Sequence, residues 1–203
     1  MKNLGYIFLL LMLLTSSITY AQQPDSKEAK KAAKVADIKN LLDQRNFVFK
    51  AQYANPLGGG TTALNGKLIN ITPGGTGHIY LNYDYDVKIR PDSVISFLPY
   101  YGTITFDPPY SPTDDGIKFT STKFGYKVKQ SKKGRTIITI TPQDAKYIQK
   151  LILDVSPEGY ANLNINITNR YSISYDGYIA APNKDHGDKN PQSASTGTNK
   201  EGN

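Results

Sequence analysis

Residues 161–168 read Ala-Asn-Leu-Asn-Ile-Asn-Ile-Thr, and apolar and polar side chains alternate through the whole stretch. Ala161, Leu163, Ile165 and Ile167 form the apolar row. Successive side chains of a β-strand point to opposite faces of a sheet, so this pattern places one row inside the protein and the other toward water. The stretch predicts a strand of an antiparallel sheet with one buried face.

The same period of two recurs along most of the chain. In residues 80–89 it puts Leu81, Tyr83, Tyr85, Val87 and Ile89 on one face. Asn65-Gly66 is a dipeptide typical of tight hairpins and predicts a strand pair around it. Further short strands are predicted at 47–51, 94–98, 103–106, 117–122, 126–130, 135–141, 147–155 and 171–179. The expected fold is mainly β, an antiparallel sandwich or barrel of about ten strands with one N-terminal helix.

The N-terminus has the layout of a secretory signal peptide. Lys2 gives a basic start, an apolar run extends from Tyr6 to Leu14, and small residues lead to Ala21. A membrane-spanning helix needs about 20 apolar residues, so this run is too short to be one. We expect residues 1–21 to be cleaved after Ala21 and the protein to be periplasmic or extracellular.

The remaining chain divides into three predicted parts. Residues 22–46 favour a helix or tether, with Asp25 and Glu28 as a capping box and a narrow apolar stripe in the last turns, formed by Val35, Ile38, Leu41 and Leu42. Residues 47–182 are the antiparallel β domain. Residues 183–203 lack aromatic side chains and are expected to be disordered.

Composition excludes several classes of chemistry. The chain has no cysteine, so disulfides, thiolate zinc sites and a lipid anchor through cysteine are ruled out. The net charge of +7 is dispersed rather than clustered, which favours ordinary solvated charge over nucleic-acid binding. No metal or cofactor is expected.

Candidate catalytic groups are few. His78 and His186 are the only histidines, and His186 lies in the predicted tail. Asp84 and Asp86 are two residues apart on one predicted strand, about 7 Å by strand rise, a spacing within reach of paired-carboxylate glycosidases. Their expected face is wet, however, which would not raise the pKa of a proton donor. We therefore expect a protein that is not an enzyme.

Tyrosine is the unusual feature of the composition. The chain holds 15 tyrosines and no tryptophan. Tyr100, Tyr101 and Tyr110 lie beside prolines and glycines, and these three are the candidate binding rim because tyrosine offers a large contact area and a polar tip. The alternative interpretation is that such residues cap the ends of the β core and bond to turn backbone.

Four stretches together resemble a bacterial family known only as domain of unknown function 4251. They are residues 47–51, 98–102, 116–119 and 169–177, and the most specific of them is Leu98-Pro99-Tyr100-Tyr101-Gly102. The family usually has Phe where this chain has Tyr101, and often Gly where it has Asp115. The resemblance implies exported proteins of Gram-negative bacteria, and it supplies no activity, substrate or catalytic residue.

The function predicted from the sequence is that of an exported, non-enzymatic β-domain that binds an envelope protein or glycan. Two alternatives stay open. One is a carrier of a small apolar ligand, in which the row from Leu81 to Ile89 lines a barrel cavity. The other is a polysaccharide hydrolase that uses Asp84 with a second carboxylate.

Overall fold

The computed structural model describes residues 26–57, 60–64, 67–71, 78–102, 104–105, 116–131 and 134–182. The segments predicted as signal peptide and disordered tail, and Tyr110 with Asp114 and Asp115, lie outside these residues. The elements in chain order are α2 (Ser26–Asp43), β1 (Phe47–Pro56), β2 (Gly60–Leu64), β3 (Lys67–Ile71), β4 (Ile79–Tyr80), β5 (Asp86–Ile89), β6 (Val94–Leu98), β7 (Ile117–Ser121), β8 (Phe124–Gln130), β9 (Thr136–Pro142), β10 (Ile148–Val155), β11 (Tyr160–Ile167) and β12 (Ile173–Ala180).

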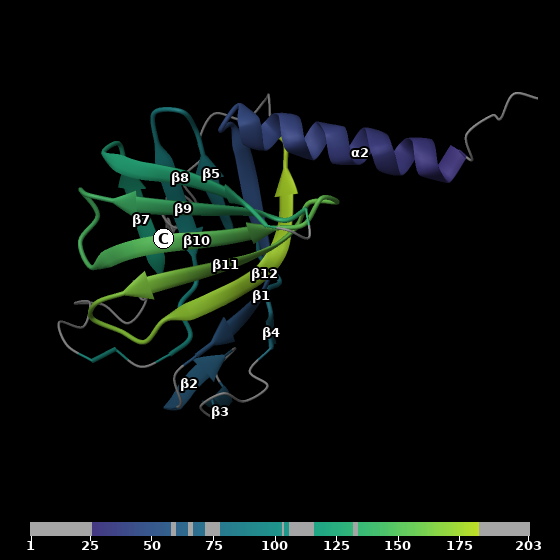
Figure 1. Cartoon of the computed structure of the whole chain (residues 1–203). Coiled ribbons are helices and arrows are strands. Elements are labelled where there is room, and N and C mark those ends of the chain that lie inside the picture. Colours follow the sequence, from purple (N-terminus) through teal and green to yellow (C-terminus); the bar gives the residue numbers. More distant parts are fainter. Residues whose placement is uncertain are drawn as a thin grey trace, which may run out of the picture.

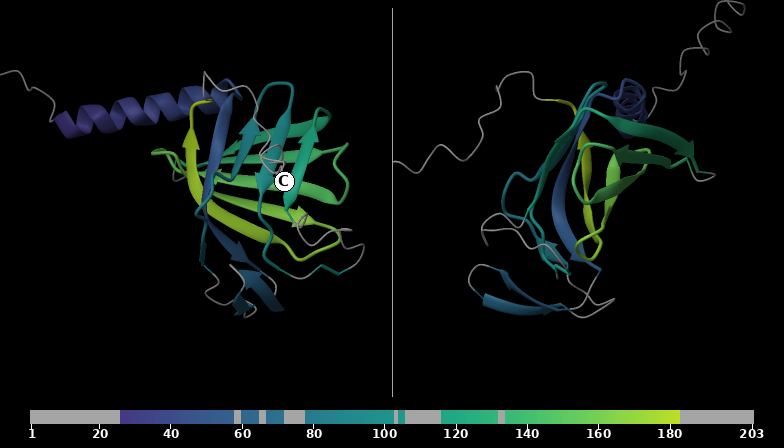
Figure 2. Two further views of the ribbon diagram at one scale, coloured as in Figure 1. Left: turned by 180° about the vertical axis from the view of Figure 1, so that it is seen from behind. Right: turned by 90° about the vertical axis from the view of Figure 1, so that its left-hand side faces the viewer.

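Ten of the strands form one antiparallel sheet that curls into a nearly closed, barrel-like shape. Their order is β7-β6-β5-β1-β12-β11-β10-β9-β8, and the short β4 adds to β1. The sheet bends so that β5 and β7 lie behind β8, β9 and β10 (Figure 1), and the side view in Figure 2 shows the two halves facing each other. The predicted antiparallel fold is confirmed, and the hairpin predicted around Asn65-Gly66 is the separate β2–β3 pair.

The interior is packed with the apolar rows of the strands. The largest fully buried side chains are Tyr175, Phe47, Phe49, Ile89, Leu98, Ile138, Ile140, Leu151, Leu153, Ile165, Ile173 and Val87. In β11 the alternation read from the sequence is confirmed, because Ala161, Leu163, Ile165 and Ile167 are all buried. Burial of such apolar side chains is the main force that holds the sheet closed.

The single strand predicted for residues 80–89 is wrong. β4 and β5 are separate strands that pair with different parts of β1, on either side of a β-bulge between Ala51 and Tyr53. The chain between them follows the bulge, with the Leu81 N–H donating to the Gln52 carbonyl. Tyr83 is consequently half exposed and stands outside the core, so the predicted inward row is interrupted.

A second predicted strand is reduced to one bridge. Around residues 103–106 the structure has an isolated antiparallel bridge between Ile104 and Arg170, supported by a hydrogen bond from the Thr105 N–H to the Asn169 carbonyl. These contacts tie the long connection between β6 and β7 to the connection between β11 and β12.

The N-terminal helix docks by its last turns, where the sequence has its apolar stripe. Ile38 and Leu42 are buried, and Ile38 packs against Gly159 in the β10–β11 turn. The helix ends in a Schellman motif, in which the Asn46 N–H donates to the Leu41 carbonyl and Arg45 takes the left-handed conformation (φ 51°). Its first turns extend away from the sheet (Figure 1).

Candidate functional site

Two of the three tyrosines predicted as a binding rim, Tyr100 and Tyr101, lie among the described residues, and both pack against the core. Tyr100 is 8% exposed and belongs to the hydrophobic core, and Tyr101 is partly buried against that core. The Tyr100 hydroxyl donates to the Tyr171 carbonyl oxygen at 3.0 Å. Burial raises the pKa of Tyr100 to about 12, against the opposing effect of the Arg170 charge. A binding role for this group, with Tyr110 outside the described residues, stays a prediction.

Two sequence motifs that are far apart in the chain, residues 98–102 and 169–177, are in contact in the structure. The fully buried Tyr175 donates its hydroxyl to the Pro99 carbonyl oxygen at 2.5 Å. The Tyr100 ring lies so close to Gly102 that a Cβ there would sit 2.7 Å from the Tyr100 hydroxyl. Residues 98–102 and 169–177 are therefore joined by tyrosine hydroxyls that bond to backbone carbonyls, which is the alternative interpretation considered for the tyrosines.

The two aspartates considered for glycoside hydrolysis share a cation instead of flanking a cleft. The Lys50 ammonium lies 2.8 Å from Asp84 and 2.9 Å from Asp86. The Asp84 side chain is 76% exposed, whereas that of Asp86 is only 13% exposed, so the expectation of a wet face is wrong for Asp86. Burial opposes the charged amine, but hydrogen bonds and charges from both carboxylates outweigh it and raise the pKa of Lys50. The arrangement is an ion-paired brace between β1 and the start of β5.

His78 lies directly before β4 and belongs to a polar network. Its Nδ1 is 2.7 Å from the Asn55 Oδ1, and the Asn55 amide donates to the Asp176 carboxylate at 2.7 Å. Because a carboxylate only accepts, the Asn55 NH₂ must face Asp176 and its oxygen must face His78. This arrangement places a proton on Nδ1 of His78, which leaves Nε2 as an acceptor when the ring is neutral. The hydrogen-bonded neighbour of this histidine is an amide, an arrangement suited to binding.

Asp176 is the centre of this network. Its second oxygen accepts from the Asn162 amide at 2.8 Å, so two amides hold one carboxylate from opposite sides. A carboxylate offers about four acceptor positions, and the two amide bonds leave about two of them for a ligand. The Asp176 side chain is 43% exposed, which keeps those positions accessible.

Aromatic rings flank the polar network on the same outer face of the sheet. On one side the rings of Tyr53 and His78 stack at 4.2 Å, and Tyr80 meets Tyr53 edge-on at 5.5 Å. On the other side Tyr160 and Tyr178 are direct cross-strand partners. We call the whole set the tyrosine–amide face: Tyr53, Asn55, His78, Tyr80, Tyr160, Asn162, Asp176 and Tyr178.

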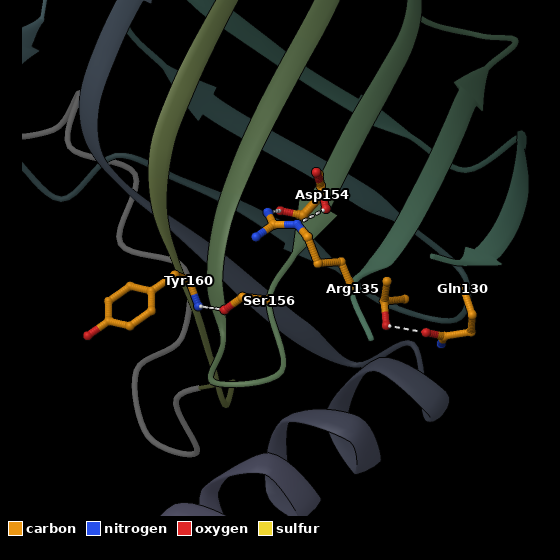
Figure 3. A network of polar contacts seen from close by, with 6 residues as sticks. Gln130, Arg135, Asp154, Ser156 and Tyr160 are labelled. Atoms are coloured by element: carbon orange, nitrogen blue, oxygen red, sulfur yellow. Dashed lines mark hydrogen bonds and ion pairs between the residues drawn. The ribbon is translucent and has the colours of Figure 1, made fainter. Parts of the chain in front are cut away.

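Three rings of the tyrosine–amide face are exposed. Tyr80 is 66%, Tyr160 65% and Tyr178 40% exposed. Near Tyr160, its backbone N–H donates to the Ser156 hydroxyl and Arg135 pairs with Asp154. Figure 3 shows the Tyr160 ring directed away from both contacts. Lys34 of the helix lies 5.4 Å from the centre of the Tyr160 ring.

Local backbone rules place these side chains together. The β-bulge in β1 allows Ala51 and Ala54 both to face the core while Tyr53 and Asn55 point outward. In β11 and β12 the period of two brings the outward Asn162 opposite Asp176 and the outward Tyr160 opposite Tyr178. The signal in the sequence was the asparagine row of residues 162–166, which indicated an outer face but not the residues that lie beside it.

Among the described residues no group of three or more histidine, aspartate or glutamate side chains is arranged to hold a metal ion. In the same part of the chain, no helix is both long and apolar enough to cross a membrane.

The fold and this face define a mainly antiparallel β protein with a barrel-like sheet and an aromatic, polar outer surface. The chain belongs to the family described as domain of unknown function DUF4251, whose model matches residues 29–179. It is similar to a DUF4251 family protein from Bacteroides eggerthii DSM 20697 known from a crystal structure, with 16% identity over 75% of this chain and 91% of that one and a TM-score of 0.44. No curated protein matches the chain.

Proposed function

We propose that the chain is an exported, non-enzymatic β-domain of the bacterial envelope that binds its partner through the tyrosine–amide face. The observation that carries this proposal is the combination of exposed Tyr80, Tyr160 and Tyr178 with a hydrogen-bonded carboxylate between them. Exposed tyrosines are enriched where proteins recognise other molecules, because they provide contact area at a low entropy cost.

The surroundings of the polar residues favour binding over catalysis. Asp84 and Asp86 are paired with one lysine, and His78 is bonded to an amide and stacked on Tyr53. Each polar group is thus held in a fixed position on the surface of a rigid sheet. Such a surface orients a ligand well and supplies no activated nucleophile.

The packed interior supports a surface site rather than a carrier cavity. Tyr175, Phe47 and Phe49 fill the inside of the sheet, and the row proposed to line a cavity is interrupted at Tyr83. A ligand that binds this chain would therefore meet the outside of the barrel.

Export is the second part of the proposal and rests on residues 1–21 of the sequence. The full chain and a version without these residues would be expressed in a Gram-negative host. We expect only the full chain to reach the periplasm or medium, with a mature N-terminus at Gln22 on sequencing. Cytoplasmic retention of the full chain would contradict export.

Binding would be tested by co-sedimentation with envelope fractions. We expect the full mature protein to sediment with the envelope, and Tyr80→Ala/Tyr178→Ala to lose most of this binding. Tyr171→Ala is the matched control, because Tyr171 is also half exposed and lies outside the tyrosine–amide face. A third variant, Tyr101→Ala, tests the rim predicted from the sequence. Equal sedimentation of the double variant and the parent protein would refute binding through this face.

A further inference from the structure

We infer that the partner of the tyrosine–amide face is a neutral glycan chain, with sugar rings on the tyrosines and hydroxyl groups on Asp176, Asn162 and His78. This inference rests on the proposed function and adds the chemical class of the ligand. It follows from three properties of the face: its alternation of rings with acceptors, its charge and its extent.

The first property is the chemistry that the ligand must supply. Asp176 has unused acceptor positions, and Nε2 of His78 is an acceptor in the neutral ring. An apolar ligand group placed over Asp176 and His78 would leave their acceptor atoms without hydrogen bonds. The binding free energy would then be less favourable by about as much as lost hydrogen bonds cost. A pyranose ring carries hydroxyl donors on its edge and an apolar C–H face that stacks on an aromatic ring, so it satisfies both parts of the surface at once.

The second property is the charge. Asp176 is a partly exposed anion at the centre of the face. Of the cations near the face, Lys50 is the cross-strand partner of Tyr178 and is already held by two aspartates, and Lys31 is paired with Glu158. Lys34 lies over the Tyr160 ring, at one end of the face. A carboxylated or phosphorylated sugar at the centre would face the Asp176 charge across a short distance, which disfavours it. The face therefore selects neutral sugars.

The third property is the extent. Tyr80, Tyr53, Asp176 and Asn162 lie on four adjacent strands, which corresponds to about 14 Å across the sheet at the usual strand spacing. Tyr178 and Tyr160 lie two residues further along, about 7 Å by strand rise. The exposed rings are separated by more than one sugar, and they lie on the outside of a curved sheet. This arrangement fits several consecutive units of a chain better than a single small molecule.

The test is an array of neutral and acidic glycans probed with the mature protein. We expect hits among neutral hexose and N-acetylhexosamine chains. Loss of one stacking ring, in Tyr80→Ala or Tyr178→Ala, should weaken binding about tenfold. Tyr80→Phe keeps the ring and should retain most of the binding, and Tyr171→Ala should bind like the parent protein. Thermal melts of each variant would show that the fold is intact.

A separate variant tests whether the charge of Asp176 makes the face prefer neutral glycans. Asp176→Asn removes the negative charge and keeps the size of the side chain, so it should raise binding to uronic-acid chains relative to neutral ones. Preference of the parent protein for acidic glycans would overturn the inference. So would the absence of glycan hits when envelope binding is protease-sensitive and still depends on Tyr80 and Tyr178; in that case the proposed function stands and the partner is a protein. If envelope binding does not depend on these tyrosines either, both proposals fail.

Discussion

The hydroxyl of Tyr175 donates a 2.5 Å hydrogen bond to the carbonyl oxygen of Pro99, and the tyrosine side chain is completely buried. This contact joins β12 to the end of β6, two strands that are not neighbours in the sheet. Burial raises the pKa of the Tyr175 hydroxyl well above its ordinary value, with smaller effects from Tyr100 and Tyr101. The hydroxyl therefore stays protonated and remains a donor over the physiological range.

Removing that donor should destabilise the protein without changing its surface. Tyr175→Phe leaves the Pro99 carbonyl without this partner in a buried setting, and we expect a loss of about 1–3 kcal/mol in the free energy of unfolding. Urea denaturation followed by circular dichroism measures it. Tyr160→Phe removes a hydroxyl from an exposed ring and serves as the control, with an expected change near zero. Equal changes in the free energy of unfolding of the two variants would show that the buried hydrogen bond stabilises the fold no more than the exposed hydroxyl does.

Gly177 is required where β12 pairs with β1, opposite Ala51. A Cβ at this position would overlap the Lys50 carbonyl oxygen and press on the Phe49 ring. Gly177→Ala should therefore force the two strands apart, and we expect a large loss of stability or a failure to accumulate as soluble protein. In the control variant, Gly125→Ala, the new Cβ would meet Thr141 at an ordinary 3.8 Å. The midpoints of thermal unfolding of the two variants provide the comparison.

The fold could be predicted from local pattern wherever a strand keeps its period of two. The alternation in 161–168 predicted β11 and its buried row correctly, and Asn65-Gly66 predicted the β2–β3 hairpin. The prediction failed for residues 80–89, because the bulge in β1 that separates β4 from β5 belongs to a different part of the chain. The alternation of residues within one strand does not indicate whether the strand that pairs with it contains a bulge.

The candidate site was less predictable, because pairing assembles it from distant segments. Asn55 and Asp176 bond to each other although they are 121 residues apart. The tyrosines that the sequence singled out lie beside prolines and glycines, whereas Tyr80, Tyr160 and Tyr178 lie inside strands and look like ordinary strand residues. Which face of a strand is covered depends on the curl of the sheet, and that is decided by all the strands together.

The ion-paired brace at Lys50 gives a third prediction. Lys50→Met keeps the aliphatic stem but leaves the mostly buried Asp86 carboxylate without its cation. An unpaired buried charge is costly, so we expect reduced stability in urea denaturation. Adding Asp86→Asn should restore much of the loss, because the double variant has no stranded charge. Additive losses in the double variant would indicate that the pair is not coupled.

Asp144 gives a prediction about pH. It accepts hydrogen bonds from the Ser121 hydroxyl and from the Thr122 and Lys123 N–H groups, which hold the turn between β7 and β8 against the start of the β9–β10 connection. The Ser121 bond first, and then the backbone bonds, lower the pKa of Asp144 from 3.8 to about 2. A lowered pKa in the folded state means that the ionised carboxylate stabilises the fold above pH 4, and that this contribution is lost as the pH falls toward 2.

A comparison of Asp144→Asn with the parent protein tests whether the contribution of Asp144 to stability is lost as the pH falls. At pH 6 the variant should melt at a lower temperature, because an amide is a weaker acceptor for three donors. The difference should narrow between pH 4 and pH 2 as the parent carboxylate takes up a proton. Asp92→Asn is the control, since its carboxylate accepts from the adjacent Ser93 hydroxyl on the exposed surface and both variants lose one negative charge. A difference that stays constant over this range would show that the charge of Asp144 does not stabilise the fold.

The docked end of the helix gives the last prediction. Ile38 is buried against Gly159, a residue whose φ of 90° and close approach leave no room for a side chain. Ile38→Ala should open a gap at this contact and cost about 2 kcal/mol, the lower end of the range for buried isoleucine because the site lies at the edge of the core. Hydrogen exchange should show faster opening of residues 26–43 while β10 and β11 stay protected. Ala36→Ser, on the exposed side of the same turn, should leave the exchange unchanged. If both variants exchange alike, the helix is held by contacts other than Ile38, and Lys34 is not positioned at Tyr160 by this packing.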